Sequence, residues 1–309
     1  MGIKMGKTAF VFPGQGSQYV GMGRDFYENI PACKAVFETA SKASGLDVEA
    51  LCFEENDQIN ITEYTQIAML ATEIAILKAV EEKGIRPDVT AGLSLGEYGA
   101  VYTAGIMDLE DIFRLIRKRG IYMQEAVPEG GAMIAVLGLD TAVIEQICEE
   151  TPGMVTVANY NCPGQIVITG EEKAAAEAME KLTAAGAKRC VPLKVSGPFH
   201  SPLLVGAGEK LAKELETVSL KEMQIPYIAN VTADYVNSLD QVKPLLQQQV
   251  SASVRWQQSV ERMIADGVDT FIEIGPGRTL TGFMKKINKD VTAINIEKLE
   301  DLVKLDTLG

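Results

Sequence analysis

Short apolar runs alternate with longer, helically periodic segments along this chain, a pattern typical of strands alternating with helices. The first run is followed by a glycine-rich turn, Pro-Gly-Gln-Gly-Ser. The predicted elements begin with a strand at 8–12 and an amphipathic helix from about Thr62 to Lys83, which ends at Gly84. They continue with a strand at about 89–93, a helix through Ala104, and a helix from about Asp108 to Ala126. Since such alternation builds layered sheets, we predict an α/β fold with a mostly parallel sheet.

The pattern changes between 131 and 199. The predicted order there is strand, helix, strand, strand, helix, strand, at 132–137, 141–150, 154–158, 166–169, 171–185 and 190–195. This order is the split βαβ, or ferredoxin-like, arrangement. The α/β pattern then resumes with a helix near 203–216 and strands near 226–229 and 270–274. We therefore predict a small domain, 131–199, inserted into a large domain made of 1–130 and 200–309.

Composition and charge narrow the functional classes. The 309 residues are 47% hydrophobic and 23% charged, typical of a globular chain, and the net charge is −13. This acidic balance argues against nucleic acid and against an anionic membrane surface. No apolar stretch reaches the roughly 20 residues of a spanning helix, and the first residues lack the long apolar region that a signal peptide needs. Met5 is a candidate start residue, with 1–4 as a leader.

The chain has one histidine, His200. A zinc site built on several imidazoles is therefore excluded, and any imidazole base must be His200. The five cysteines are scattered, odd in number and never in C-x-x-C spacing, which indicates free thiols in a reducing cytoplasm. A catalytic pair of Cys162 with His200 stays open as an alternative.

The pentapeptide 92–96, Gly-Leu-Ser-Leu-Gly, matches G-x-S-x-G, the nucleophile elbow, in which small residues allow a sharp turn between strand and helix. The turn exposes the Ser94 hydroxyl, and the next helix aims its N–H groups at the site. The predicted strand before it and helix after it favour a nucleophile over a purely structural turn.

A serine nucleophile needs a base, and His200 lies in the Pro- and Gly-flanked loop Ser-Gly-Pro-Phe-His-Ser-Pro, 196–202. The alternative is a surface or capping histidine. We favour the base because Ser94 has no other imidazole to use. No unmistakable Asp completes a triad, so a backbone carbonyl or an amide side chain would orient the ring.

Helical phase distinguishes Arg119 from its basic neighbours. It lies on the apolar stripe of the predicted 108–126 helix, whose members are Ile112, Leu115, Ile116, Met123 and Ala126. A guanidinium on a core-facing stripe needs a partner. That partner is either a protein carboxylate or a substrate carboxylate held by two parallel hydrogen bonds.

Two glycine turns remain. The turn at 13–18 permits close backbone approach, but no G-K-[ST] follows, which argues against a phosphate loop. We interpret the turn at 275–278 as structural.

Six motifs in this order and spacing resemble the malonyl-CoA:acyl carrier protein transacylase family of fatty-acid synthesis. They are FPGQGSQ at 12–18, YTQ at 64–66, GLSLGE at 92–97, KRG at 118–120, GPFHS at 197–201 and EIGPG at 273–277. The resemblance covers nearly the whole chain and implies an α/β-hydrolase-like core interrupted by a ferredoxin-like subdomain. One departure is Leu93, where many members have His; that residue is not the base, so we expect no loss of chemistry.

The resemblance also implies a role for each site residue. Ser94 would be the nucleophile and His200 its base, and the N–H groups of Gln15 and Leu95 would form the oxyanion hole. Arg119 would bind the malonyl carboxylate. The Gln249 main-chain carbonyl would orient the histidine. The GPFH form of the histidine motif is the version associated with malonyl rather than methylmalonyl units.

The resemblance further implies malonyl-CoA as substrate, the phosphopantetheine thiol of acyl carrier protein as acceptor, and no bound cofactor or metal. We expect a cytoplasmic monomer without nucleic-acid or membrane partners. Two other classes stay open: a serine hydrolase or thioesterase, in which water receives the acyl group, and a non-catalytic module that binds a carrier protein.

Overall fold

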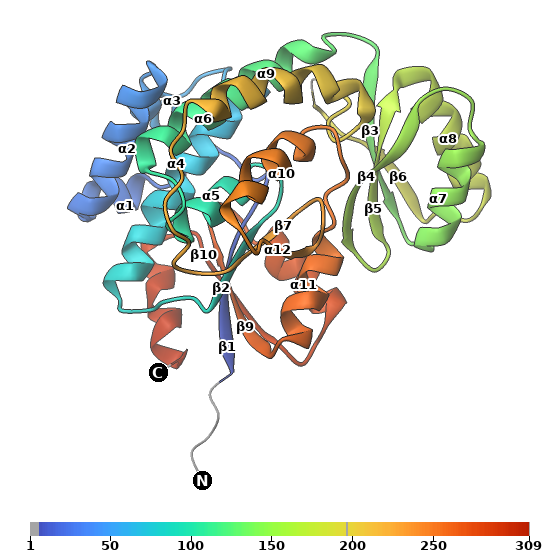
Figure 1. Ribbon diagram of the computed structural model, residues 1–309. Helices are drawn as coiled ribbons and strands as arrows, with labels where there is room; N and C mark the ends of the chain where they lie inside the picture. The colour runs from blue at the N-terminus through green and yellow to red at the C-terminus, as the bar shows by residue number, and fades with distance from the viewer. Residues whose placement is uncertain (1–5, 196, 309) are drawn as a thin grey trace.

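The computed structural model describes residues 6–195 and 197–308, so the candidate start Met5 lies outside the described residues. The fold is a mixed α/β arrangement with two sheets. A mostly parallel six-stranded sheet lies within the larger, left-hand part of the molecule in Figure 1, and a four-stranded antiparallel sheet lies on the right-hand side. The mixed α/β prediction with a mostly parallel sheet is confirmed.

The six-stranded sheet has β1 near its centre, in the order β10-β9-β1-β2-β7-β8. Its strands are β1 (Lys7–Phe12), β2 (Val89–Gly92), β7 (Tyr227–Ala229), β8 (Asp234–Tyr235), β9 (Val268–Ile274) and β10 (Thr292–Ile296). All pairs are parallel except β7 with β8. β1 and β2 end together, with Phe12 opposite Gly92. The loops that follow these two strands therefore meet at one edge of the sheet.

Alternation along β1 separates two hydrophobic cores. Phe10 and Phe12 face one core, whereas Ala9 and Val11 face the other, because successive side chains point to opposite faces of a sheet. The helices of the first core include α1 (Arg24–Asn29), α2 (Pro31–Ser44), α3 (Val48–Phe53), α4 (Thr62–Glu82), α5 (Gly96–Thr103), α6 (Leu109–Ala126), α9 (Val205–Glu216) and α10 (Val242–Gln249). Those of the second core are α11 (Trp256–Ala265) and α12 (Thr279–Ile287). Three short 3₁₀ segments are Pro202–Leu204, Leu239–Gln241 and Leu299–Leu308.

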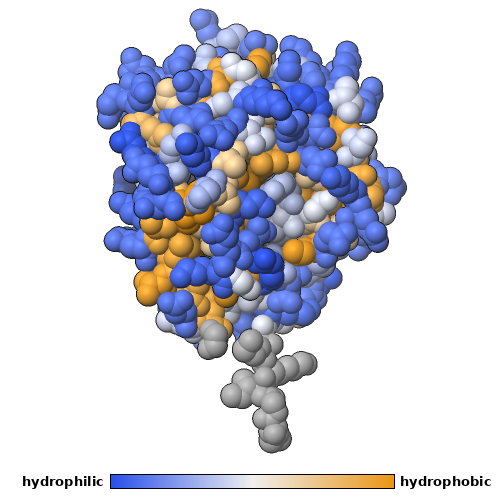
Figure 2. All heavy atoms as spheres, turned by 90° about the vertical axis from the view of Figure 1, so that its left-hand side faces the viewer, coloured by the Kyte–Doolittle hydropathy of each residue, from blue (hydrophilic) through white to orange (hydrophobic). Residues whose placement is uncertain are grey.

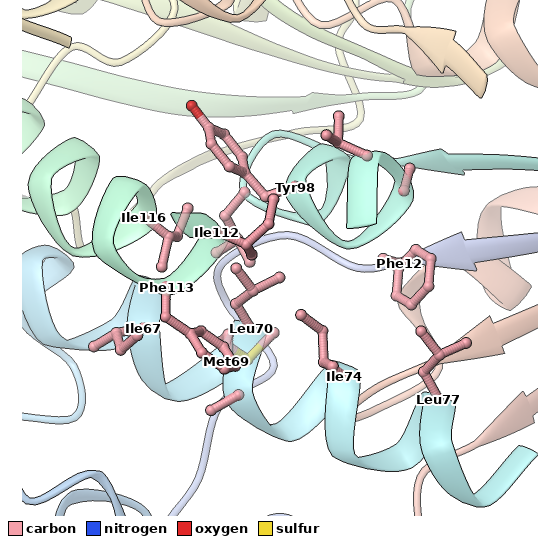
Figure 3. Close-up of a cluster of buried hydrophobic side chains, with 14 of the residues drawn as sticks. Phe12, Ile67, Met69, Leu70, Ile74, Leu77, Tyr98, Ile112, Phe113 and Ile116 are labelled. Atoms are coloured by element: carbon pink, nitrogen blue, oxygen red, sulfur yellow. The ribbon is translucent and has the colours of Figure 1, made fainter. Parts of the chain in front are cut away.

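The prediction that the helix beginning at Thr62 is amphipathic is wrong. α4 has the expected bounds, but it packs against α2, α3, α5, α6 and β9 and is buried on nearly every side. Figure 3 shows its Ile74 and Leu77 near Phe12 of β1, while Ile67 and Leu70 lie near Phe113 and Ile112 of α6. The α1–α3 helices lie outside it, on the largely hydrophilic face that Figure 2 shows. A central helix needs an apolar surface all round, and such a helix has no polar stripe.

The four-stranded sheet has the predicted chain order of strand, helix, strand, strand, helix, strand. Its elements are β3 (Gly131–Leu137), α7 (Thr141–Glu150), β4 (Val155–Cys162), β5 (Gln165–Glu171), α8 (Glu172–Ala184) and β6 (Arg189–Pro192). The strands pair antiparallel in the order β4-β5-β3-β6, and apolar residues of α7 and α8 share a core with them. The division of the chain into domains stays a prediction.

The chain after α10 ties the two sheets together. Val254 forms a parallel bridge with Asn159 of β4, and its backbone exchanges hydrogen bonds of 2.9 and 2.8 Å with Tyr160 and Ala158. Ser253 adds a side-chain hydrogen bond to Val157. This segment begins directly after Gln249 and Val250, so the second sheet helps to position the end of α10.

The burial of α4 can be tested at Thr72, which is fully buried and donates to the Ala68 carbonyl. We expect Thr72→Lys to lower the free energy of unfolding by about 4 kcal/mol or more, because it buries an unpaired charge. Glu82→Lys, at the exposed end of the same helix, should change it by about 0.5 kcal/mol at most. Urea denaturation followed by circular dichroism measures the free energy of unfolding of both variants. Equally small changes would indicate that α4 is amphipathic after all, with Thr72 on a solvent-exposed face.

Candidate functional site

Two glycines make the turn between β2 and α5 possible. A Cβ atom on Gly92 would overlap the carbonyl of Gly96, and one on Gly96 would overlap the Phe12 carbonyl. The turn also places Ser94 at a φ of 54°, in the left-handed region that is costly for a non-glycine residue. Strain of this kind at a half-buried serine is typical of a nucleophile elbow.

Ser94 and His200 are brought together as the sequence predicts. The Ser94 Oγ lies 2.8 Å from Nε2 of His200, and the His200 Nδ1 lies 2.8 Å from the Gln249 main-chain oxygen. A carbonyl oxygen can only accept, so Nδ1 carries the proton and Nε2 accepts from the serine. The ring is therefore in the tautomer that can remove the serine proton.

The base is buried and neutral. His200 is 4% exposed and has a φ of 59°, and its N–H donates to the Val250 carbonyl. Burial, together with the positive charge of Arg119, lowers the pKa of His200 to about 4, although backbone hydrogen bonds raise it in part. At neutral pH the ring is thus unprotonated, the form that a general base needs.

The loop after β1 packs on the elbow. A Cβ atom on Gly14 would lie 2.8 Å from the Leu93 side chain and 2.9 Å from its carbonyl oxygen, and the Leu93 N–H donates to Phe12. Among the described residues, the backbone N–H groups of Gln15 and Leu95 donate to no protein acceptor. Two free donors on adjoining turns can stabilise an oxyanion formed at Ser94.

Arg119 lies beside the nucleophile, on the buried stripe of α6. It is 1% exposed, and it forms no ion pair with any carboxylate in the described part of the chain. Its Nη2 donates to Ser94 Oγ and to Gln249 Oε1, both at 3.0 Å, and its Nη1 donates to Gln66 Oε1 at 2.6 Å. The buried Nε has no protein partner within residues 6–195 and 197–308. Of the two partners left open, a protein carboxylate is thus not the one observed.

Three polar residues and the side chain of Gln249 surround Arg119 and the elbow, and the sequence predicted no role for any of them. Asn230 accepts from the Ser94 N–H at 2.8 Å and donates to the Gly92 carbonyl at 2.6 Å. Glu97 is fully buried, and Gln66 and the Gln249 side chain hold the guanidinium. Gln66 and Glu97 lie within the motifs YTQ and GLSLGE, so their place in a motif could have pointed to a role in the site. Asn230 lies in no motif, and no feature of the sequence pointed to it.

The remaining candidates lie outside this site. Cys162 is buried in the second core with Trp256, and burial raises the pKa of its thiol, so it is not an activated nucleophile. The glycine turn at 275–277 packs on Pro13 and Ser17 and supports the loop after β1. No group of three His, Cys, Asp or Glu among the described residues is suited to hold a metal, and no described helix is long and apolar enough to cross a membrane.

Comparison with known proteins supplies an independent finding. The family model described as acyl transferase domain matches residues 9–304. The malonyl CoA-acyl carrier protein transacylase of Bacillus subtilis (strain 168) is 44% identical over 303 residues, covering 96% of each chain. The crystal structure of malonyl CoA-acyl carrier protein transacylase from Clostridium perfringens is 45% identical, with a TM-score of 0.94, covering 97% of this chain and 96% of that one.

One further structure includes a partner. It is described as a type II polyketide synthase acyl-carrier protein in complex with its malonyl-transacylase. The matched chain of that structure is 40% identical to this chain, with a TM-score of 0.93. The match covers 96% of this chain and 98% of that one.

The low pKa of His200 predicts how the reactivity of Ser94 depends on pH. Labelling by a fluorophosphonate should speed up as pH rises through about 4 and then stay level through neutral pH, because the neutral ring is the base. Intact mass at timed intervals gives the rate, and circular dichroism confirms that the protein is folded at each pH. A midpoint near about 6.5, the value for an unperturbed histidine, would contradict the buried neutral base.

Proposed function

The chain belongs to the acyl transferase domain family, and from this premise we propose that it transfers malonyl from malonyl-CoA to acyl carrier protein for fatty-acid synthesis. The observation that carries the proposal is the buried guanidinium of Arg119, 3.0 Å from the Ser94 hydroxyl and without a carboxylate partner in the described chain. A malonyl group presents a thioester carbonyl to the serine and a carboxylate to the arginine at the same time.

In the first step Ser94 Oγ attacks the thioester carbonyl of malonyl-CoA. His200 Nε2 takes the hydroxyl proton, and the oxyanion accepts hydrogen bonds from the N–H groups of Gln15 and Leu95. The carbon–sulfur bond then breaks. The coenzyme A thiolate leaves with the proton that His200 returns, and the malonyl group remains on Ser94 as an ester.

In the second step the phosphopantetheine thiol of acyl carrier protein enters the same site. His200 takes the thiol proton, the sulfur attacks the ester carbonyl, and the bond to Ser94 Oγ breaks. The proton returns to Ser94. No cofactor or metal enters either step, since a thioester is exchanged for an ester and then for a second thioester.

Arg119 acts on the base as well as on the substrate. Its positive charge is the second cause, after burial, of the low pKa of His200. When the malonyl carboxylate binds the guanidinium, that charge is balanced, and the imidazolium formed during attack costs less free energy. Substrate recognition and base strength are coupled through one side chain.

The two alternative classes are less well supported. A serine hydrolase would use Ser94 and His200 in the same way, but it has no need for a buried cation beside the nucleophile. Measuring acyl release with and without carrier protein separates hydrolysis from transfer. A non-catalytic binding module would not require the hydrogen bond between Ser94 and His200.

The finer architecture belongs to the same proposal. We assign residues 1–130 and 200–309 to an α/β-hydrolase-like large domain and 131–199 to a ferredoxin-like small domain, with the site at the ends of β1 and β2. The five free cysteines, four of them buried, fit a cytoplasmic enzyme. That the enzyme acts as a monomer stays a prediction.

Ser94→Ala tests the nucleophile. After incubation with malonyl-CoA, intact mass of the unaltered protein should show one malonyl adduct, and the variant should show none. Transfer to carrier protein should fall by about 10⁴-fold or more, as for other removed nucleophiles. Labelling that persists at another residue would refute the assignment.

Arg119→Ala tests recognition of the carboxylate. We expect malonyl transfer to fall by about 100-fold, because the substrate charge loses its buried partner, while the relative activity on acetyl-CoA increases. Steady-state rates with both substrates give the ratio. Equal losses for malonyl and acetyl would indicate a structural arginine instead.

A further inference from the structure

The side-chain amide of Gln249 has a different set of partners at each end. Its Nε2 lies 2.6 Å from Glu97 Oε2, 2.9 Å from the Ser94 carbonyl and 3.2 Å from Asn230 Oδ1. Its Oε1 accepts from Arg119 Nη2 at 3.0 Å. Glu97, Gln249 and Arg119 are at most 1% exposed, so water does not compete for these hydrogen bonds.

This arrangement permits only one orientation of the Gln249 amide. The partners at the nitrogen end are acceptors, whereas a guanidinium has donors and no acceptor. Reversing the amide would place its oxygen against the Glu97 carboxylate and its N–H₂ group against Arg119. Glu97 supplies the nearest of the three acceptors, at 2.6 Å, and therefore the closest constraint on this orientation.

Glu97 is itself held through one of its two carboxylate oxygens. It lies in the first turn of α5, directly after the elbow, and its Oε2 also accepts from the Asn230 N–H at 3.2 Å. Its Oε1 has no protein partner in the described chain. Burial raises the pKa of Glu97 to about 7, and the Asn230 N–H, the Gln249 amide and the charge of Arg119 each lower it in part.

We propose that Glu97 is a positioning residue for Arg119. Its carboxylate fixes the Gln249 amide with the oxygen toward the guanidinium, and the fixed amide holds the guanidinium in place for the carboxylate of the substrate. Glu97 touches neither the substrate nor His200. This inference rests on the proposed function, because it names how the arginine of that site is kept in position.

Two variants of Glu97 separate the hydrogen bond from the charge. Glu97→Leu removes the acceptor, and we expect the ratio of malonyl to acetyl transfer to fall by about tenfold. Glu97→Gln keeps an oxygen where the Asn230 and Gln249 donors need one, so its ratio should stay within about threefold of the unaltered protein. Glu110→Leu, on the exposed face of α6, is the matched control and should leave the ratio unchanged.

A structural role for Glu97 would lower malonyl and acetyl transfer alike, and that result would overturn the proposal. A second test makes the same substitution in the Arg119→Ala variant. There Glu97→Leu should change malonyl transfer by less than about twofold, because the side chain that it positions is gone. An undiminished loss in that background would also overturn the proposal.

Two further measurements test the proposal if Glu97→Leu does not fold or if the protein does not transfer malonyl. Should Glu97→Leu not fold, Gln249→Met removes the same amide but keeps the main-chain carbonyl bound to His200, and it should give the same selective loss. Should the unaltered protein form no malonyl adduct, the proposed function fails. In that case the free energies of unfolding in urea of the single and double variants test whether Glu97 and Arg119 are coupled. If the losses caused by Glu97→Leu and Arg119→Ala simply add, the coupling is refuted.

Discussion

The site depends on burying the charge of Arg119 without giving it a carboxylate neighbour. A buried guanidinium is costly unless its donors are satisfied; here amide and hydroxyl oxygens accept from Nη1 and Nη2, whereas Nε has no protein partner in the described chain. These acceptors come from α4, α10 and the turn after β2, three parts of the chain that must all be in place. The packing of those elements is therefore also what positions the cation, and the same cation lowers the pKa of His200.

The end of α10 connects this site with the second sheet. Gln249 contacts His200 through its main chain and Arg119 through its side chain, and the Val250 carbonyl accepts from the His200 N–H. Four residues later Val254 pairs with β4. A shift of the four-stranded sheet against the parallel sheet would thus move the residues that orient the base. The geometry of the base consequently depends on both sheets.

Local and periodic features of the site could be predicted from the sequence, and the single histidine identified the distant partner of Ser94, whereas contacts of residues outside any motif could not be predicted. The elbow around Ser94 lies within five residues, and helical phase alone placed Arg119 in the core. The contact of Ser94 with Asn230 joins residues 136 apart, and Asn230 stands in no recognisable motif. The error on α4 has a similar cause, because the number of helices that cover a segment is a tertiary property.

Within residues 6–195 and 197–308 no carboxylate hydrogen-bonds to the His200 ring, and the charge of Arg119 gives a physical reason for this choice. A carboxylate at Nδ1 would place a negative charge within the field of the buried guanidinium, whose charge already acts on the His200 ring, and would compete for that cation. The Gln249 carbonyl selects the same tautomer of His200 but carries no charge. The carboxylate that the site does contain, on Glu97, is separated from Arg119 by the Gln249 amide. A neutral acceptor at the base thus leaves Arg119 without an ion pair in the described part of the chain.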